Sequence, residues 1–375
     1  MVLQMNRCKR CLTPTSRPDT EFVDGVCSAC ISYAKRTETD WDARKSELMA
    51  LLERSEETRA RTGYNCIVPS SGGKDSTYQV ITLLDLGFRP LVVTATTCLL
   101  TPIGRRNIDN LARYATTVEV TPNRTVRAKL NRIGLETVGD ISWPERMAIF
   151  TIPFKIATQT GINILFYGEN PQNQYGGPVG TENAKHLTRR WRSEFGGFLG
   201  LRPQDAIGQF GITADDMRDY EMPHQSETEG IEAHFLGYYF PWDSGRNAEV
   251  ARRHGMQQQC PSVANFWESE NLDNAMTGLH DFFGYLKYGY GRACAQVSVE
   301  IRQGKLTRDQ GICIIKTLDG IFPNMYAGVH ISDVLRHISL SAEELGGIIA
   351  RFKNTELFDA EHRSDLRPIL REFSQ

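Results

Sequence analysis

The sequence has no long apolar run and no excess of charge of one sign. No segment approaches the roughly 20 apolar residues that span a membrane, and the opening MVLQMNRCKRCL lacks the apolar core of a secretory signal. Lys and Arg together number 43 and Asp and Glu 45, for a formal net charge of −2. A membrane partner and a nucleic-acid partner held by an overall basic field are therefore disfavoured, and we expect a cytoplasmic protein.

A disulfide framework is also missing from the sequence. The nine cysteines belong to a chain expected in a reducing compartment, where disulfides are rare. Five of them are scattered in apolar or mixed surroundings and are expected to be small buried residues, namely Cys66, Cys98, Cys260, Cys294 and Cys313.

The other four cysteines form two C-x2-C pairs separated by fifteen residues, and they are Cys8, Cys11, Cys27 and Cys30. This spacing lets two tight turns present four thiolates to one tetrahedral ion, and it predicts structural zinc in an N-terminal ribbon. With four protein ligands the ion has no open position, which argues against a catalytic metal. An iron–sulfur cluster and a metal-free cluster are the alternatives that the spacing leaves open.

Composition divides the chain into three regions. We expect a zinc ribbon over residues 1–45, an α/β nucleotide-binding domain over 60–225, and a helical and loop-rich region over 226–375 that completes the substrate site. Thr39 or Asp40 is expected to cap a connecting helix. Between residues 64 and 170 short apolar runs alternate with helical stretches, which predicts βαβ units and a buried parallel sheet. Beyond residue 170 we expect long structured loops, followed by a helical end.

The common phosphate-loop pattern is absent as well. A Walker A loop needs a glycine five residues before its Gly-Lys pair and a Ser or Thr after it, but this chain has Val68 and Asp75 there. The run SGGKDS over residues 71–76 nevertheless stands between an expected strand and an expected helix. Glycines, hydroxyl groups and the unpaired amides of a helix N-terminus suit phosphate. The alternative is a glycine-rich turn with a serine cap.

The run over residues 71–76 resembles the SGGxDS signature of the PP-loop ATP pyrophosphatases. The resemblance implies a Rossmann-like core of the adenine nucleotide α-hydrolase type, in which ATP is cleaved to AMP and pyrophosphate while a carbonyl oxygen is adenylated. It implies catalytic roles for Lys74 and Asp75, with Asp75 beside Mg²⁺. The implied ATP-binding residues are Ser71, Gly72, Gly73, Lys74, Asp75, Ser76, Thr94 and Arg106.

Several longer segments together narrow the substrate. The cysteine-rich opening, SSGGKDSTYQ, YGENPQ, FLGYYFPWD and GLHDFFGYLKYGYGRACAQ occur in the order typical of the N-acetyl sugar amidotransferases of the WbpG and PseA type, which this chain resembles. That family is taken to convert the acetamido group of a nucleotide-linked acidic sugar into an acetamidino group, in lipopolysaccharide O-antigen and surface glycan biosynthesis. The resemblance implies a catalytic Glu169 and substrate roles for Asn170, His280, Lys287, Tyr290 and Arg292. A surface ion pair or a packing role is the alternative for each.

The resemblance also implies a partner that supplies ammonia. None of the cysteines outside the ribbon lies between glycines on a tight turn, as a glutaminase nucleophile would. We therefore expect a glutaminase subunit working with a cyclase-like (β/α)8 barrel. Two other interpretations stay open, a tRNA-thiolating PP-loop enzyme and a zinc-ribbon interaction module with an inactive nucleotide domain. His186, His224, His234 and His254 show no metal-ligand spacing and are expected to be solvated or packed.

Overall fold

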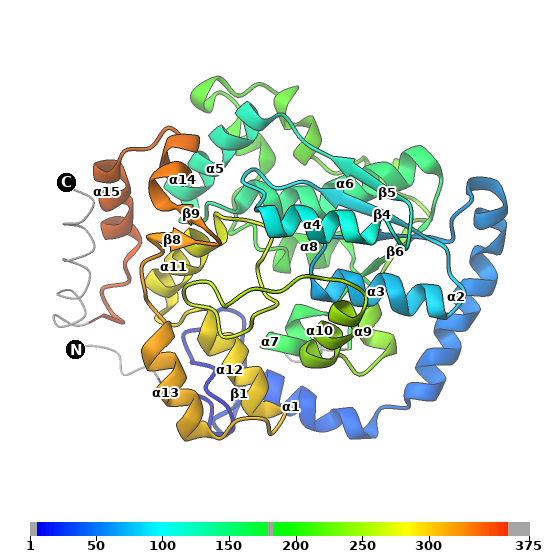
Figure 1. Ribbon diagram of the computed structural model, residues 1–375, viewed down its shortest axis with the longest axis horizontal. Helices are drawn as coiled ribbons and strands as arrows, with labels where there is room; N and C mark the ends of the chain where they lie inside the picture. Colours follow the sequence, from blue (N-terminus) through cyan, green and yellow to red (C-terminus); the bar gives the residue numbers. More distant parts are fainter. Residues whose placement is uncertain (1–5, 179, 181–182, 359–375) are drawn as a thin grey trace.

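A five-stranded parallel sheet forms the centre of the computed structural model, which describes residues 6–178, 180 and 183–358 (Figure 1). Its strands are β3 (Cys66–Pro69), β4 (Pro90–Ala95), β5 (Thr117–Val120), β6 (Ile164–Tyr167) and β7 (Glu232–Phe235). They are arranged in the order β5-β4-β3-β6-β7. From β3 the chain runs outward through β4 to β5 at one edge of the sheet, and it then crosses back to β6 on the other side of β3. The gap beyond the carboxyl ends of β3 and β6 is therefore the topological switch point. The predicted α/β class is confirmed.

The strands are apolar because both faces of the sheet are covered. Ile67 and Leu165 pack on one face against α5 (Arg124–Val138) and α6 (Trp143–Thr160). Cys66, Val68 and Phe166 pack on the other face with α2 (Trp41–Thr62) and α3 (Lys74–Asp85). Neighbouring residues of a strand point to opposite faces, so a strand buried on both sides reads as a continuous apolar run.

The other helices surround the sheet and build the region that follows it. Their bounds are α1 (Ser28–Ala34), α4 (Pro102–Leu111), α7 (Pro171–Tyr175), α8 (Arg189–Phe195), α9 (Leu236–Tyr239), α10 (Ser244–Arg253), α11 (Thr277–Tyr288), α12 (Arg292–Arg302), α13 (Arg308–Leu318), α14 (Ile331–His337) and α15 (Ala342–Phe352). Two short hairpins complete the structure, β1 (Phe22–Val23) with β2 (Val26–Cys27) and β8 (Met325–Tyr326) with β9 (Val329–His330). Helices α11, α14 and α15 share a second apolar core.

The structure differs from the sequence-based expectation at β7. This fifth parallel strand lies beyond residue 170, where loops were expected, and beyond residue 225, where the nucleotide domain was expected to end. Its four residues, EAHF, include Glu232 and His234 and therefore lack the apolar run of a buried strand. The division into three regions stays a prediction, and residues 359–375 of the third region lie outside the described residues.

The connecting helix and the C-terminal cap follow local sequence rules. Asp40 caps α2 by accepting a hydrogen bond from the backbone N–H of Ala43, as one of the two predicted caps. Ser341 and Glu344 form the reciprocal capping box at the start of α15. Figure 1 shows α2 as a long helix along the right-hand edge of the view.

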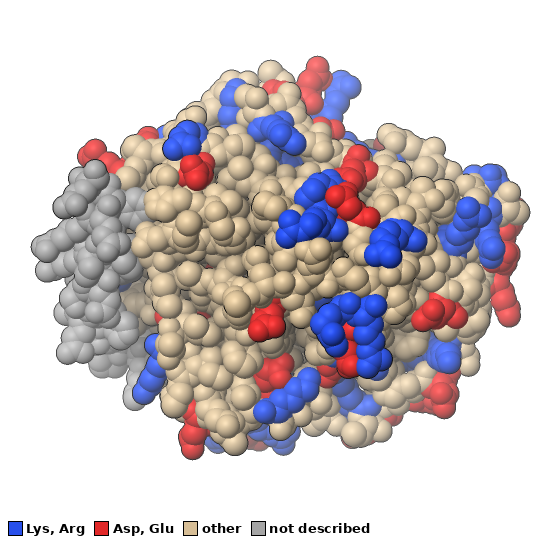
Figure 2. Space-filling view, in the orientation of Figure 1, with Lys and Arg blue, Asp and Glu red and all other residues tan. Residues whose placement is uncertain are grey.

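Charges of both signs intermingle on the face of the molecule seen in Figure 2, where the described residues form no continuous basic stripe. Within the described ranges, no helix has both the length and the apolar character that a membrane crossing requires.

Candidate functional site

A cavity of about 450 Å³ opens at the topological switch point of the sheet. Its walls are the turn after β3, the ends of β4 and β6, the start of α4, and a loop over residues 269–273 that arrives from far along the chain. Open α/β sheets bind their ligands at this place, because the loops of neighbouring strands diverge there.

The turn between β3 and α3 is shaped by Gly72. Its φ is +78°, and a Cβ added to it would stand 2.7 Å from the backbone N of Ile108 in α4. Helix α3 then begins at Lys74, and no side chain caps its N-terminus. The turn therefore brings backbone close to α4 and leaves the first amides of α3 without a side-chain acceptor, an arrangement suited to an anion.

Lys74 is buried at the base of this cavity, with its side chain only 5% exposed. Its Nζ lies 2.6 Å from Asp75 Oδ2, 2.7 Å from Glu270 Oε2, and 5.6 Å from the centre of the Trp267 ring. Burial by itself disfavours the charged form, but the carboxylates of Asp75 and Glu270 outweigh it and raise the pKa of Lys74 well above its usual value. The cavity thus contains a permanent buried cation.

Two further carboxyl groups of the cavity have raised pKa values. Burial, helped by the charge of Asp75, raises the pKa of Glu169 to about 7. Burial raises the pKa of Asp273 to about 6. Together with Asp75 and Glu270 they place four carboxyl groups around one cavity. Carboxylate oxygens are the type of ligand that Mg²⁺ prefers in proteins.

A second cavity of about 230 Å³ contains most of the residues expected to meet the substrate. His280, Lys287, Tyr290 and Arg292 line it, and they come from α11, from the turn after it and from the start of α12. The other charged residues of its wall were not expected from the sequence, and they are Arg17, Asp140, Arg146 and Asp281.

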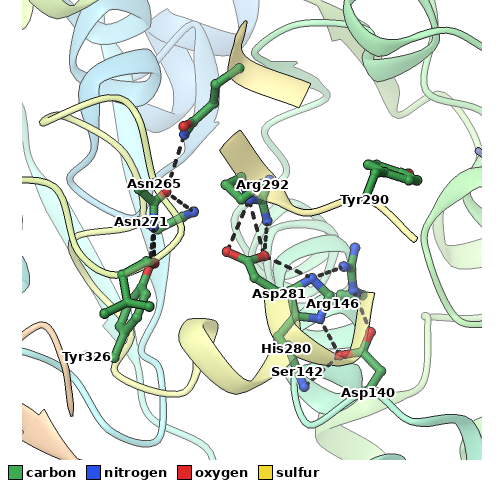
Figure 3. A network of polar contacts seen from close by, with 12 residues as sticks. Asp140, Ser142, Arg146, Asn265, Asn271, His280, Asp281, Tyr290, Arg292 and Tyr326 are labelled. Atoms are coloured by element: carbon green, nitrogen blue, oxygen red, sulfur yellow. Dashed lines mark hydrogen bonds and ion pairs between the residues drawn. The ribbon is translucent and has the colours of Figure 1, made fainter. Parts of the chain in front are cut away.

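The floor of the second cavity is a connected polar network (Figure 3). Arg146 donates to His280 Nε2 at 2.9 Å, so the proton of a neutral imidazole must lie on Nδ1, which is 2.7 Å from Asp140 Oδ1. Burial alone would raise the pKa of Asp140, but His280 and Arg146 hold it below its usual range. Arg292 forms a two-pronged contact with Asp281, its shortest N–O distance being 2.7 Å. The network fixes three cationic or polar side chains along one wall.

Helix α12 contributes to the wall of the second cavity and also contacts the segment that leads to the first. Arg292 lines the second cavity at the first turn of this helix. One turn further, Gln296 accepts a hydrogen bond from the backbone N–H of Phe266 and donates to Asn265, whose Oδ1 also accepts from Asn271. This pins the segment that continues into the 269–273 wall of the first cavity.

The four ribbon cysteines gather as the spacing predicts. All are buried, and their sulfur atoms lie within 4.8 Å of one another. Cys8 and Cys30 are 3.9 Å apart and Cys11 and Cys27 3.6 Å. Tetrahedral zinc–sulfur bonds of about 2.3 Å place two sulfur atoms roughly 3.8 Å apart, so the group is compatible with one zinc ion. A cluster of several metal atoms would hold the sulfurs further apart.

The structure brings most of the predicted nucleotide residues into the first cavity. Residues 71–76 and Glu169 line it. Thr94 and Arg106 do not, since the wall of β4 is made by Val93 and Ala95, and Arg106 binds Gln257 on the surface. Asn170 caps α7 by accepting from the backbone N–H of Gln172 and lines neither cavity. The functional roles of all these residues stay predictions.

Sequence reasoning missed Glu270, Asp273 and Arg17. The stretch SENLD over residues 269–273 is short and polar within a region interpreted as loops, and its two carboxylates were the only indication. Arg17 lies in a turn-prone stretch of the ribbon that was considered only as a spacer.

No metal-ligand spacing links His186 and His234 in the sequence, but in the structure their rings lie 4.5 Å apart, and possible ligand atoms of both lie within 4.8 Å of Glu232. The carboxylate of Glu232 is already paired with Arg54 at 2.8 Å.

The strand order and the cavity at the switch point define a doubly wound α/β protein with a Rossmann-like ligand site. Residues 261–371 match the family model described as "LPS biosynthesis protein WbpG-like, C-terminal domain". The match supports the WbpG type expected from the sequence over this region, which includes Glu270, His280 and Arg292.

No curated protein matches the chain. Among solved structures the chain is similar to the NMN synthetase from Francisella tularensis, with a TM-score of 0.28 and 12% identity, over 60% of this chain and 99% of that chain. Because this TM-score is low, the fold is assigned from the strand order of the sheet itself.

Proposed function

We propose that this chain is an ATP-dependent synthetase that adenylates the acetamido group of a nucleotide-linked acidic sugar and then joins ammonia to it, forming an acetamidino group for lipopolysaccharide O-antigen or surface glycan. The observation that carries the proposal is Lys74, buried between Asp75 and Glu270 directly after a glycine-rich turn, in a cavity beside a second one with four basic side chains. The WbpG-like match over residues 261–371 supports it.

The first half-reaction belongs to the first cavity. The acetamido oxygen attacks the α-phosphorus of ATP, the new O–P bond forms, and the bond to pyrophosphate breaks. Lys74 and the amides at the start of α3 stabilise charge on the phosphate oxygens. Mg²⁺, when bound, neutralises further phosphate charge, and Asp75, Glu270 and Asp273 offer the oxygen ligands that would hold it.

The second half-reaction needs a proton acceptor. Ammonia adds to the activated carbon, the nitrogen loses a proton, and the C–O bond breaks so that AMP leaves with the former acetamido oxygen. Glu169, with a pKa raised to about 7, is the group proposed to take the proton. An amide by itself is a poor electrophile, so adenylation is what makes the exchange of oxygen for nitrogen feasible.

The competing interpretations have less support in the molecule. A tRNA-thiolating enzyme would want a cysteine near the nucleotide, and none of the described residues that line the first cavity is a cysteine. An inactive nucleotide domain would have no need of a lysine held between two carboxylates beside the glycine turn.

The test is product analysis with candidate UDP- and CMP-linked acetamido sugars, added one at a time to purified protein with ATP, Mg²⁺ and ammonium salt. We expect AMP and pyrophosphate, and a substrate labelled with ¹⁸O in its acetamido group should transfer the label to AMP. Main products of ADP and phosphate, or AMP without the label, would contradict the proposal.

Two variants of the first cavity provide the matched comparison. Lys74→Ala and Asp75→Asn should each lower pyrophosphate release by orders of magnitude, since nucleotidyl transfer depends chiefly on positioned charge. Lys45→Ala removes an exposed lysine of α2 instead and should leave the rate unchanged. Equal losses in all three variants would indicate a general effect of charge or folding.

A further inference from the structure

The zinc ribbon is packed onto the domain that follows the sheet. Arg308 of α13 donates to the backbone carbonyls of Cys8 and Cys11, and Arg7 donates to the sulfur of Cys294 in α12 at 3.2 Å. Figure 1 shows the ribbon against α12 and α13. Because these contacts involve the backbone of the cysteine turns themselves, the position of the ribbon depends on the shape that the four cysteines give it.

This packing carries one ribbon side chain into the second cavity. Arg17 lines that cavity, donates to the hydroxyl oxygen of Tyr290 at 3.0 Å, and lies over the rings of Tyr175 and Tyr290 at 5.7 and 5.9 Å. Beside it, Ser16 donates to the backbone carbonyl of Tyr288. The ribbon therefore forms part of the wall of the second cavity, and the hydrogen bonds of Ser16 and Arg17 hold it there.

Arg17 forms no ion pair with the other described residues. Among the described residues no carboxylate lies within 4.0 Å of it, and its Nε is buried without a hydrogen-bond partner. Lys287, on the same cavity, donates only to the backbone carbonyl of Val138, and burial lowers its pKa. The acidic residues of the wall are already used, since Asp140 binds Arg146 and His280, and Asp281 binds Arg292. Two cations thus line the cavity without an ion pair to a carboxylate of the described residues.

Cations beside aromatic rings fit a ligand with phosphate groups next to a flat ring system. Tyr288 and Tyr290 both line the cavity, with ring centres 6.3 Å apart. A guanidinium recognises phosphate oxygens with two parallel hydrogen bonds and stacks on rings at the same time, which an ammonium group does less well. We infer that the zinc ribbon is a wall of the sugar-nucleotide site and that Arg17 binds the diphosphate of a nucleoside diphosphate held in the second cavity. This inference rests on the proposed function only because that function makes a sugar nucleotide the expected ligand.

Binding of UDP and of ATP to the full chain, measured separately by calorimetry, tests this inference without any turnover. Arg17→Ala should weaken UDP binding roughly 10- to 100-fold, the loss expected for charge-assisted hydrogen bonds, and leave ATP binding within about twofold. Lys74→Ala should do the reverse. Arg17→Lys, which keeps the charge but not the planar fork, should recover part of the UDP affinity.

Arg10→Ala is the matched control, because Arg10 is an exposed basic residue of the same ribbon that does not line the cavity. It should leave the affinity for UDP unchanged. No UDP binding by the unaltered chain, an Arg17→Ala affinity within about twofold of it, or an equal loss for UDP and ATP would overturn the inference. If UDP binding depends on Arg17 while no acetamido sugar is amidinated, the proposed function fails and the ribbon site stands.

Discussion

At the scale of a single residue, Lys74 supplies the positive charge that balances carboxylates of the first cavity. It is paired with Asp75 and Glu270, and Glu169 lies in the same field with a raised pKa. Removing the lysine would leave two partly buried carboxylates without their cation, which costs more than an exposed ion pair is worth. Burial, helped by the charge of Asp75, raises the pKa of Glu169 to about 7, which is near neutral pH, where a proton acceptor works best.

The first prediction concerns the pH dependence due to Glu169. Because burial raises its pKa to about 7, the carboxyl group is mostly protonated below that pH and accepts a proton only above it. The rate of acetamidino formation, at a fixed concentration of free ammonia, should therefore rise through pH 7, and Glu169→Gln should abolish this rise and lower the rate at least tenfold. Pyrophosphate release in the first half-reaction should change much less. An unchanged pH profile in Glu169→Gln would remove this residue from the role of base.

The turn between β3 and α3 shows how an element controls the site. Gly72 has a left-handed backbone conformation and lies against the backbone of α4, whereas the next residue, Gly73, has a φ of −74° that any residue adopts. Two adjacent glycines in one motif thus have different physical requirements. Gly72 allows the turn to form, and Gly73 serves as the N-cap of α3.

The second prediction separates these two glycines. Gly72→Ala introduces a strained φ and a Cβ 2.7 Å from the backbone N of Ile108, and it should lower the free energy of unfolding by about 1–3 kcal/mol and abolish ATP binding. In Gly73→Ala the nearest atom to the new Cβ is Ser71 Oγ at 3.3 Å, so the loss should stay below about 1 kcal/mol. Urea unfolding followed by circular dichroism measures both. Equal destabilisation would show that the backbone of the turn adapts.

The third prediction concerns the ribbon as an element. Metal analysis of protein purified without chelators should find one zinc per chain, lost in Cys27→Ala and kept in Cys313→Ala, which removes an exposed cysteine outside the cluster. Hydrogen exchange in Cys27→Ala should quicken over residues 6–30 more than over β3, because metal binding is folding energy for so small a module. Iron in place of zinc, or a full complement of zinc in Cys27→Ala, would contradict the assignment.

At the scale of the whole molecule, Cys98 and Cys294 are poorly suited to be the thiol that makes ammonia. Burial raises the pKa of Cys98 and of Cys294 to about 12. Cys98 Sγ does lie 2.8 Å from His337 Nε2, yet burial also lowers the pKa of His337. Both shifts favour the neutral thiol and the neutral imidazole, whereas a glutaminase needs a thiolate.

The fourth prediction concerns the source of the ammonia. Purified protein should modify its sugar with a high concentration of ammonium salt at alkaline pH, where free ammonia is abundant, and should fail with glutamine alone. Addition of a glutaminase with its cyclase-like (β/α)8 barrel partner should restore activity with glutamine. Cys98→Ser should keep the ammonium-dependent rate. Strong glutamine-dependent turnover by this chain alone, lost in Cys98→Ser, would reveal a glutaminase site.

The sequence by itself determined the features that depend on neighbours along the chain. The cysteine spacing gathers four sulfur atoms, the run over residues 71–76 places glycines and a lysine at the start of a helix, and Asp40 and Ser341 mark helix caps. The apolar runs indicated four of the five parallel strands. Each of these rests on spacing of a few residues, which a linear pattern records directly.

Only the tertiary structure decided which distant residues share a site. Glu270 reaches Lys74 across 196 positions and Arg17 reaches Tyr290 across 273, and no local pattern encodes such contacts. Strand β7 escaped detection because its four residues include two ionisable side chains and gain their place by pairing with β6. A polar residue in a surface loop costs little free energy at almost any position. Which residues lie next to it is therefore set by the packing of the helices and strands that the loop connects.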